Sequence, residues 1–336
     1  MAPKLFITGG TGYIGGTVLD TIVKTHPEYD VTALLRNVPS NFSTRYPNVH
    51  IVKGDYDSTD IISDAASKAE IVVHNGNSDH QPSLQALITG LLRRPTPSYL
   101  IHLSGTGIVA DWRTPTYLTT LNPRIWSDIH DLAEITSRPQ GELHRHTDAL
   151  IQSYVCSHRD KLKTAIVCPP DIYGPGRGPG RTQSVYFPLF WNEIQKVGAA
   201  FYAGEGTNRR SWVHVEDLMG VYLKLVEAAV AGGEGAEWGV EGYYFASSQE
   251  ASQIEIARAA GRILKDQGRI ESEEPMQVSL DQVNTMLGDR MPGLGTYMFA
   301  ANSRTRADRA KKLFGYEPSH PSLWDTMEAD LLACLK

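Results

Sequence analysis

Cysteine is scarce in this chain, with three in 336 residues, Cys156, Cys168 and Cys334. They are too few and too widely spaced for a disulfide framework or a paired-cysteine metal site, so we expect a reducing compartment and no metal. Long apolar runs are also missing, and the stretch Lys4–Thr8 leads directly into glycine without the apolar segment of a signal peptide. We therefore expect a cytoplasmic protein with no membrane partner.

An excess of charge of one sign is absent as well. The chain carries 32 Lys and Arg against 38 Asp and Glu, a formal net charge of -6, and the two signs are interspersed. This pattern offers no positive surface for a phosphate backbone, so we expect a small-molecule substrate and no nucleic acid. Hydrophobic residues at 41% and charged residues at 21% are typical of a globular protein, and the length suggests about two domains.

Short apolar runs alternate with segments of helical periodicity through the first half of the chain. We expect strands at 5–8, 31–35, 49–52, 71–74, 99–103 and 164–168, and helices at 13–24, 61–68, 84–93 and 142–157. This alternation predicts an α/β fold of the Rossmann type, with a doubly wound parallel sheet.

A segment dense in proline and glycine at 169–180 is expected to hold no regular element and to mark a hinge. We expect a dinucleotide-binding Rossmann domain over 1–170, to which 210–246 returns, and a smaller C-terminal substrate-binding lobe over 171–336. Beyond the hinge we expect strands at 212–215 and 243–246, and helices at 185–197, 217–231, 251–264 and 304–314.

The segment Thr8–Gly15 follows the first strand and opens a helix, which is the context of a dinucleotide-binding loop. Glycines at its start, middle and end permit a tight turn, a close approach of the backbone to a pyrophosphate and close packing of helix on strand. The expected cofactor-binding residues of this loop are Gly9, Thr11, Gly12, Tyr13, Ile14 and Gly15.

The second strand ends without the acidic residue that would hold the ribose of NAD. Arg36 and Asn37 stand there instead and suit a 2′-phosphate, so the sequence favours NADP(H) over NAD(H). Asp55, after the third strand, either accepts a hydrogen bond from the adenine amino group or caps the following helix.

Together these features resemble the extended and atypical short-chain dehydrogenase/reductases, the NAD-dependent epimerase/dehydratase or NmrA-like proteins. The resemblance spans about residues 4–220 and rests on the glycine loop, Asp55, Ser104-Gly105-Thr106, the tract from Pro169 to Pro175 and the segment 210–217. It implies a bound nicotinamide dinucleotide bordered by Pro169. It also implies a homodimer that would pair through the helices at 84–93 and 142–157.

The same resemblance implies a Ser or Thr beyond the fifth strand, for which Thr106 is the first candidate and Ser104 the alternative. The family's Tyr-x-x-x-Lys is missing, and His144 and Asp148 stand near its place, four residues apart on the expected helix. A carboxylate beside His144 would raise its pKa and make it a general acid near neutral pH. The alternative is that His144 and His146 only open a helix.

Aromatic residues around the expected substrate side imply a largely apolar pocket. The missing Tyr-Lys pair counts against a sugar-nucleotide epimerase, although four arginines would suit a second pyrophosphate, namely Arg177, Arg181, Arg209 and Arg210. The favoured hypothesis is an NADP(H)-dependent oxidoreductase acting on a small, largely apolar carbonyl, imine or enone. The alternatives are an isomerase, lyase or cyclase that uses bound nucleotide without net redox, and an NmrA-like non-enzymatic redox sensor.

Overall fold

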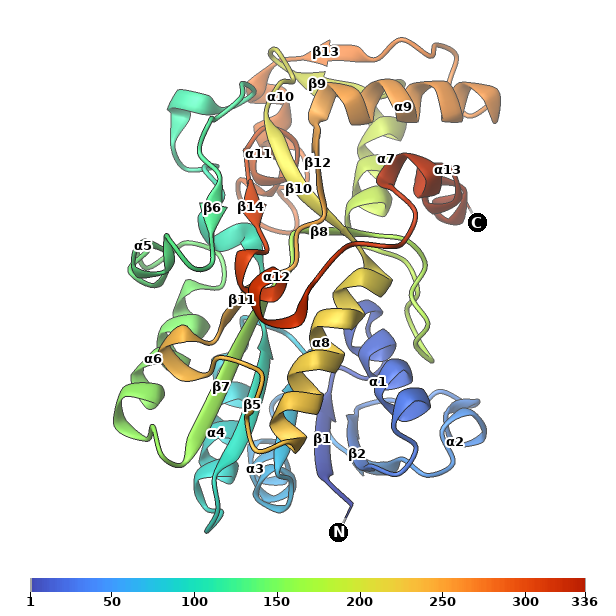
Figure 1. The fold of residues 1–336 in the computed structure, drawn as a ribbon. Coiled ribbons are helices and arrows are strands. Elements are labelled where there is room, and N and C mark those ends of the chain that lie inside the picture. The colour runs from blue at the N-terminus through green and yellow to red at the C-terminus, as the bar shows by residue number, and fades with distance from the viewer. Residues whose placement is uncertain (1, 336) are drawn as a thin grey trace.

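The central feature of the computed structural model, which describes residues 2–335, is a seven-stranded sheet (Figure 1). Its strands are all parallel and run in the order β11-β7-β5-β4-β1-β2-β3. The chain changes direction across the sheet between β1 and β4, and ligands of such sheets bind at the carboxyl ends of the strands at this point. The α/β Rossmann-type fold is therefore confirmed. The strands are β1 (Lys4–Thr8), β2 (Asp30–Leu35), β3 (His50–Lys53), β4 (Ile71–His74), β5 (Ser98–Leu103), β7 (Leu162–Cys168) and β11 (Tyr243–Phe245).

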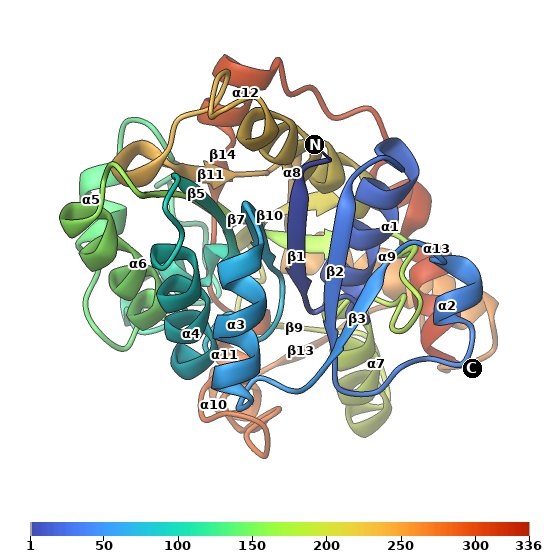
Figure 2. The ribbon, with the colours of Figure 1, turned by 90° about the horizontal axis from the view of Figure 1, so that it is seen from below.

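Helices cover both faces of this sheet (Figure 2). Leu5 and Ile7 of β1 pack in the cluster of one face and Phe6 in that of the other, because successive side chains of a strand point to opposite sides. Burial on both faces explains why these strands are apolar without alternation. One face carries α1 (Tyr13–Thr25) and α8 (Val215–Val230), and the other carries α3 (Thr59–Lys68), α4 (Gln81–Leu92) and α6 (Arg145–Ser157).

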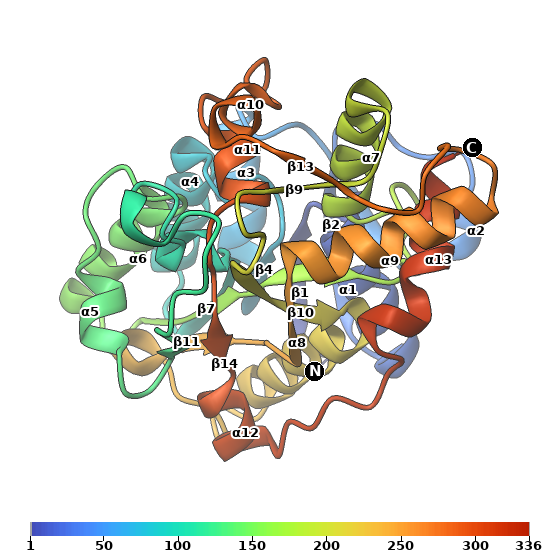
Figure 3. The same ribbon diagram turned by 90° about the horizontal axis from the view of Figure 1, so that it is seen from above.

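A smaller lobe lies above the carboxyl ends of the strands (Figure 3). Its core combines α7 (Tyr186–Val197), α9 (Gln253–Asp266) and α13 (Leu323–Cys334) with a three-stranded sheet in the order β12-β10-β8. Between residues 2 and 335, no helix has the length and apolar character needed to cross a bilayer. The remaining strands are β6 (Trp126–Ser127), β8 (Asp171–Tyr173), β9 (Phe201–Ala203), β10 (Arg209–His214), β12 (Gln249–Ser252), β13 (Met276–Val278) and β14 (Thr305–Arg306). The short helices are α2 (Phe42–Arg45), α5 (Leu132–Thr136), α10 (Leu280–Thr285), α11 (Leu294–Phe299), α12 (Asp308–Phe314), η1 (Thr106–Val109), η2 (Pro115–Tyr117) and η3 (Gly239–Glu241).

Several expected elements differ from the observed ones. The strand expected at 212–215 does not return to the central sheet, because β10 pairs with β8 and β12 in the lobe. Within 210–246, the elements that return to the Rossmann unit are α8, which packs on the central sheet, and β11, which pairs with β7. The proline- and glycine-rich segment does hold a strand, β8, and the helix expected from residue 304 begins at Asp308. The domain boundary itself stays a prediction.

The proline- and glycine-rich segment is docked tightly on α1. A Cβ atom on Gly16 of α1 would lie 2.9 Å from the Cα of Gly178, so the two backbones touch. The Tyr13 hydroxyl donates to the carbonyl of Gly174 at 2.6 Å, and Arg177 pairs with the buried carboxylate of Asp20. The segment expected to be a hinge is therefore held against the Rossmann unit by several specific contacts.

Candidate active site

The first and last glycines of the Thr8–Gly15 segment, Gly9 and Gly15, have no room for a side chain. Gly9 has a φ of 74°, and a Cβ atom there would lie 2.1 Å from the carbonyl oxygen of Asn75. A Cβ on Gly15 would lie 2.4 Å from the carbonyl oxygen of Gly9. Beside this loop, both polar atoms of the Asn75 side chain are buried, and neither has a hydrogen-bond partner in the described part of the chain. A bare backbone and an unpaired amide at the sheet's switch point fit a dinucleotide.

The adenosine end of such a ligand would meet a cavity of about 140 Å³ next to the glycine loop. Arg36 and Asn37 are both exposed and line it, as expected from the end of β2. Tyr56, which the sequence reasoning missed, forms another wall, although its position directly after Asp55 was a usable signal. The full lining is Gly9, Thr11, Leu34, Arg36, Asn37, Gly54, Asp55 and Tyr56.

The Asp55 side chain is hydrogen-bonded within its own turn. Its Oδ1 accepts hydrogen bonds from the Ser58 hydroxyl at 2.8 Å and from the backbone N–H groups of Asp57 and Ser58 at 3.1 Å. These hydrogen bonds lower the pKa of the Asp55 carboxyl, and the bond from the Ser58 hydroxyl has the largest effect. These bonds lie in the turn before α3, whose N-cap residue is Ser58, so Asp55 closes that turn and does not cap the helix, while its carboxylate still lines the cavity.

In three other residues that were expected to bind the cofactor, the side chain or the backbone carbonyl contacts other parts of the protein instead. The Tyr13 ring turns away from the loop toward Gly174, and Ile14 packs against the core on the α1 face. The carbonyl of Pro169 accepts a hydrogen bond from the N–H of Thr106 at 3.1 Å. Tyr13 and Ile14 thus have only their backbone to offer a cofactor.

The carboxyl end of β5 carries a buried carboxyl cluster. The Ser104 hydroxyl donates to Asp148 Oδ2 at 3.0 Å, and the Tyr243 hydroxyl donates to the same oxygen at 3.1 Å. Asp148 is fully buried, and its Oδ1 has no hydrogen-bond partner among residues 2–335. Burial raises the pKa of Asp148 to about 6, although the His144 charge and both hydroxyl donors act to lower it.

His144 does not pair with Asp148 as expected. The helix predicted from residue 142 begins at 145, and His144 precedes it in the left-handed conformation with a φ of 65°. That backbone directs the ring to Asp79, whose Oδ1 lies 3.1 Å from His144 Nδ1. Burial lowers the pKa of His144, but the Asp79 hydrogen bond, the Asp79 charge and the Asp148 charge outweigh it, so the pKa is raised.

The other side of the His144 ring faces the turn after β5. A Cβ on Gly105 would lie 2.9 Å from His144 Nε2, and one on Gly107 would lie 3.2 Å from the Tyr297 hydroxyl. Thr106 lies between these glycines, and no hydrogen bond engages its hydroxyl within residues 2–335, while its carbonyl accepts from Ser303. His144, Thr106 and Tyr297 therefore converge on one short segment.

Sequence reasoning missed three residues of this region. Asp79 follows β4 at the carboxyl edge of the sheet, which was a usable signal. Tyr243 and Tyr297 lie about 100 and 150 residues beyond His144 and belong to no motif, so nothing local pointed to them.

Most of the expected substrate-side residues have structural roles. The aromatic side chains of α7 and β10 form the core of the lobe, while Trp112 meets Tyr297 with ring centroids 6.3 Å apart. All four arginines considered for a second pyrophosphate are bonded within the protein. Arg177 and Arg210 bind carboxylates at 2.5 Å, Arg209 binds Glu255 at 3.1 Å, and Arg181 donates to backbone carbonyls.

Comparison with known proteins agrees with this architecture. Family models match at residues 1–89 for the NmrA-like family and at residues 126–240 for the NAD dependent epimerase/dehydratase family. The resemblance to these two families that the sequence motifs indicated is confirmed over those two segments. Oxidase ucsJ from Acremonium is 29% identical, with 98% of this chain and 96% of that protein covered. A dTDP-glucose 4,6-dehydratase from Mycobacterium tuberculosis is 21% identical, covering 78% and 77%.

Solved structures share the fold across nearly the whole chain. The dTDP-glucose 4,6-dehydratase DesIV from Streptomyces venezuelae, solved with NAD and TYD bound, has a TM-score of 0.65 at 17% identity, covering 98% of this chain and 96% of that one. A UDP-glucuronic acid 4-epimerase from Bacillus cereus, in complex with UDP-glucuronic acid and NAD, also has a TM-score of 0.65, at 16% identity and 99% coverage of both chains. Both of these neighbours were solved with NAD bound.

Proposed function

We propose that this chain is an NADP(H)-dependent oxidoreductase that acts on a small, largely apolar carbonyl, imine or enone. The observation that carries the proposal is the arrangement at the end of β5. His144 is held by Asp79 through one ring nitrogen, and its other nitrogen faces Gly105, the residue before Thr106, whose hydroxyl no hydrogen bond engages within residues 2–335. The relative named as an oxidase supports redox chemistry on this fold.

Thr106 and His144 would act on the reacting oxygen or nitrogen of the substrate. The Thr106 hydroxyl donates a hydrogen bond to that atom, and His144 Nε2 delivers a proton to it as hydride is added, or takes the proton back in the reverse direction. When bound, the nicotinamide dinucleotide supplies or accepts the hydride. Asp79 holds the imidazole through Nδ1 and keeps it protonated at higher pH than an isolated histidine.

Ser104 and Asp148 take a different role from the one expected. Both are buried and bonded to each other, with Tyr243 as the third member, so they position the end of β5 and do not contact the substrate. The sugar-nucleotide class is disfavoured because the arginines that would hold a second pyrophosphate are engaged.

The choice of cofactor rests on Arg36. It lines the adenosine cavity just after β2, whose carboxyl end lacks an acidic residue, and a guanidinium suits a 2′-phosphate. The test is a tryptophan fluorescence titration with NADPH and NADH. We expect Arg36→Ala to weaken NADPH binding about ten-fold or more, as loss of a charged hydrogen bond does, and to leave NADH binding unchanged. Arg262→Ala, an exposed arginine of α9, is the control.

Failure of this titration has two distinct meanings. Tighter binding of NADH than NADPH in the wild type would refute the NADP(H) preference alone. No binding of any nicotinamide nucleotide would refute the oxidoreductase proposal as a whole.

Catalysis is tested by screening small apolar aldehydes, imines and enones for NADPH oxidation. We expect Thr106→Ala and His144→Gln each to lower turnover about 100-fold with little change in cofactor affinity, whereas His158→Gln at the end of α6 keeps full activity. Asp79→Asn should shift the alkaline limit of the reduction rate to lower pH, because it removes the charge that raises the pKa of His144. Full activity of both site variants would refute the assignment, and product formation without NADPH oxidation would indicate a non-redox enzyme.

A further inference from the structure

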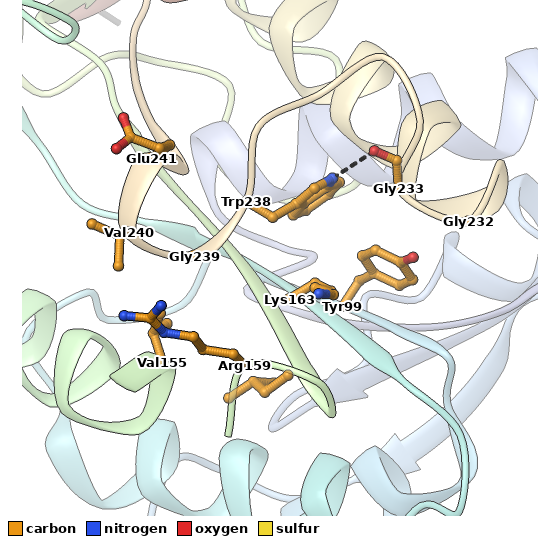
Figure 4. Close-up of a pocket in the computed structure, with 11 residues that line it drawn as sticks. Tyr99, Val155, Arg159, Lys163, Gly232, Gly233, Trp238, Gly239, Val240 and Glu241 are labelled. Carbon is orange, nitrogen blue, oxygen red and sulfur yellow. Dashed lines mark hydrogen bonds between the residues drawn. The ribbon is translucent and has the colours of Figure 1, made fainter. Parts of the chain in front are cut away.

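A second cavity lies at the amino ends of β5 and β7, at the opposite end of the sheet from the glycine loop (Figure 4). Its volume is about 410 Å³, within the range of small-molecule sites. Since β5 has six residues, the two ends of this strand are roughly 17 Å apart. The cavity is therefore separate from the cofactor site. Its lining is Tyr99, Val155, Arg159, Leu162, Lys163, Gly232, Gly233, Trp238, Gly239, Val240 and Glu241.

One wall of this cavity is aromatic and held in place. The rings of Tyr99 and Trp238 meet edge to face with centroids 5.0 Å apart, and Trp238 Nε1 donates to the carbonyl of Gly233 at 3.0 Å. Gly233 has a φ of 96°, and a Cβ atom there would lie 3.1 Å from the Tyr99 hydroxyl and 3.3 Å from Trp238 Nε1. The wall thus depends on a glycine that leaves both rings room.

The cavity also carries positive charge that the protein does not compensate. Arg159 follows α6, and Lys163 lies on β7 directly opposite Tyr99 in the strand pairing. Within residues 2–335 neither side chain forms a hydrogen bond or an ion pair with another residue. The acidic member of the lining, Glu241, is 3.3 Å from Arg309 and is engaged there.

We propose that this cavity binds a planar aromatic carboxylate. The ring of the ligand lies against Trp238 and Tyr99, and its carboxylate pairs with Arg159 and Lys163. An adjoining cavity of about 200 Å³ shares Val155, Gly239 and Val240 with the first and leaves space for an apolar substituent. This site is independent of the proposed oxidoreductase activity.

The wall of this cavity continues into a segment that reaches the buried carboxyl cluster. The helix η3 forms part of the cavity wall and leads through Gly242 into β11, whose first residue, Tyr243, donates to Asp148. A Cβ on Gly242 would lie 2.2 Å from the carbonyl of Thr164, so this connection is close-packed.

The test uses 2-naphthoate as the probe and the full-length protein labelled with ¹⁵N at the tryptophan indoles. The Trp238 signal is assigned by its loss in Trp238→Phe, and the other five tryptophans serve as internal controls. We expect the Trp238 signal alone to shift on titration, with saturation at about 1 mM or below, as the size of the probe allows.

Charge dependence identifies the anion site. The double variant Arg159→Gln, Lys163→Gln should bind the probe about ten-fold more weakly, as should the wild type with the neutral analogue 2-naphthamide. The variant Lys161→Gln, an exposed lysine outside the lining, should bind 2-naphthoate as the wild type does. Unchanged melting temperatures of the variants show that they are folded.

Three results would overturn the proposal. The first is an unmoved Trp238 signal up to the solubility limit of the probe. The second is equal affinity in the wild type and the double variant. The third is displacement of the probe by NADPH, which would place it at the glycine loop; a failure of NADPH to bind at all would concern the oxidoreductase proposal only.

Discussion

The buried carboxyl of Asp148 makes stability depend on pH in a direction opposite to that of most carboxylates. Its pKa lies at about 6 in the folded protein against an ordinary value of 3.8, because burial penalises the charge. Between these values the folded state binds a proton that the unfolded state has released. The contribution of Asp148 to the free energy of unfolding is therefore at its maximum below about pH 4 and is lost as the pH rises through 6.

The magnitude follows from the two pKa values. Each pKa unit corresponds to about 1.4 kcal/mol, so the difference between about 6 and 3.8 is worth about 3 kcal/mol of unfolding free energy. Asp148→Asn removes the titration, keeps the side-chain volume and leaves an oxygen that accepts from Ser104 and Tyr243. We expect the free energy of unfolding of the variant, relative to wild type, to rise by about 3 kcal/mol between pH 3 and pH 7.

The assay is urea denaturation at a series of pH values, with Asp160→Asn as the matched control at an exposed carboxylate just after α6. Tyr243→Phe gives a second measurement, since it removes one donor to the ionised carboxylate. That variant should raise the pKa of Asp148 further and extend the loss of stability to higher pH. Equal pH dependence of wild type and Asp148→Asn would refute the reasoning.

Two further predictions concern the Rossmann unit. Gly9→Ala places a methyl group against the Asn75 carbonyl and forces an L-residue into the left-handed region, so it should cost at least about 1–2 kcal/mol of stability and abolish nucleotide binding; normal binding measured by fluorescence would contradict the role of the loop. Arg177→Ala leaves the buried carboxylate of Asp20 with fewer donors and frees Glu216, and should lower the free energy of unfolding by about 1–3 kcal/mol in urea. An unchanged unfolding midpoint would show that the docking segment does not depend on this arginine.

The sequence by itself was enough to predict the Rossmann architecture, because the signals are local. Six of the seven central strands and the helices that cross between them follow from apolar runs and helical periodicity, and the seventh was expected at 243–246 as part of the region that returns. The glycine loop could be predicted from the spacing of its glycines, because the backbone that leaves no room for a Cβ lies a few residues away or at the end of the neighbouring strand. The placement of Arg36 and Asn37 followed for the same reason, because the end of β2 lies beside that loop.

The tertiary structure decided which polar side chains meet. The spacing of His144 and Asp148 was correct for a helical pair, but the left-handed backbone at His144 removed it from the helix and directed its ring to Asp79. Tyr243, which bonds Asp148, comes from β11, and Tyr297, which faces Gly107, comes from α11, so both reach the end of β5 from far along the chain. Local periodicity carries no information about such contacts, because they depend on how the lobe and the returning strand are placed on the sheet.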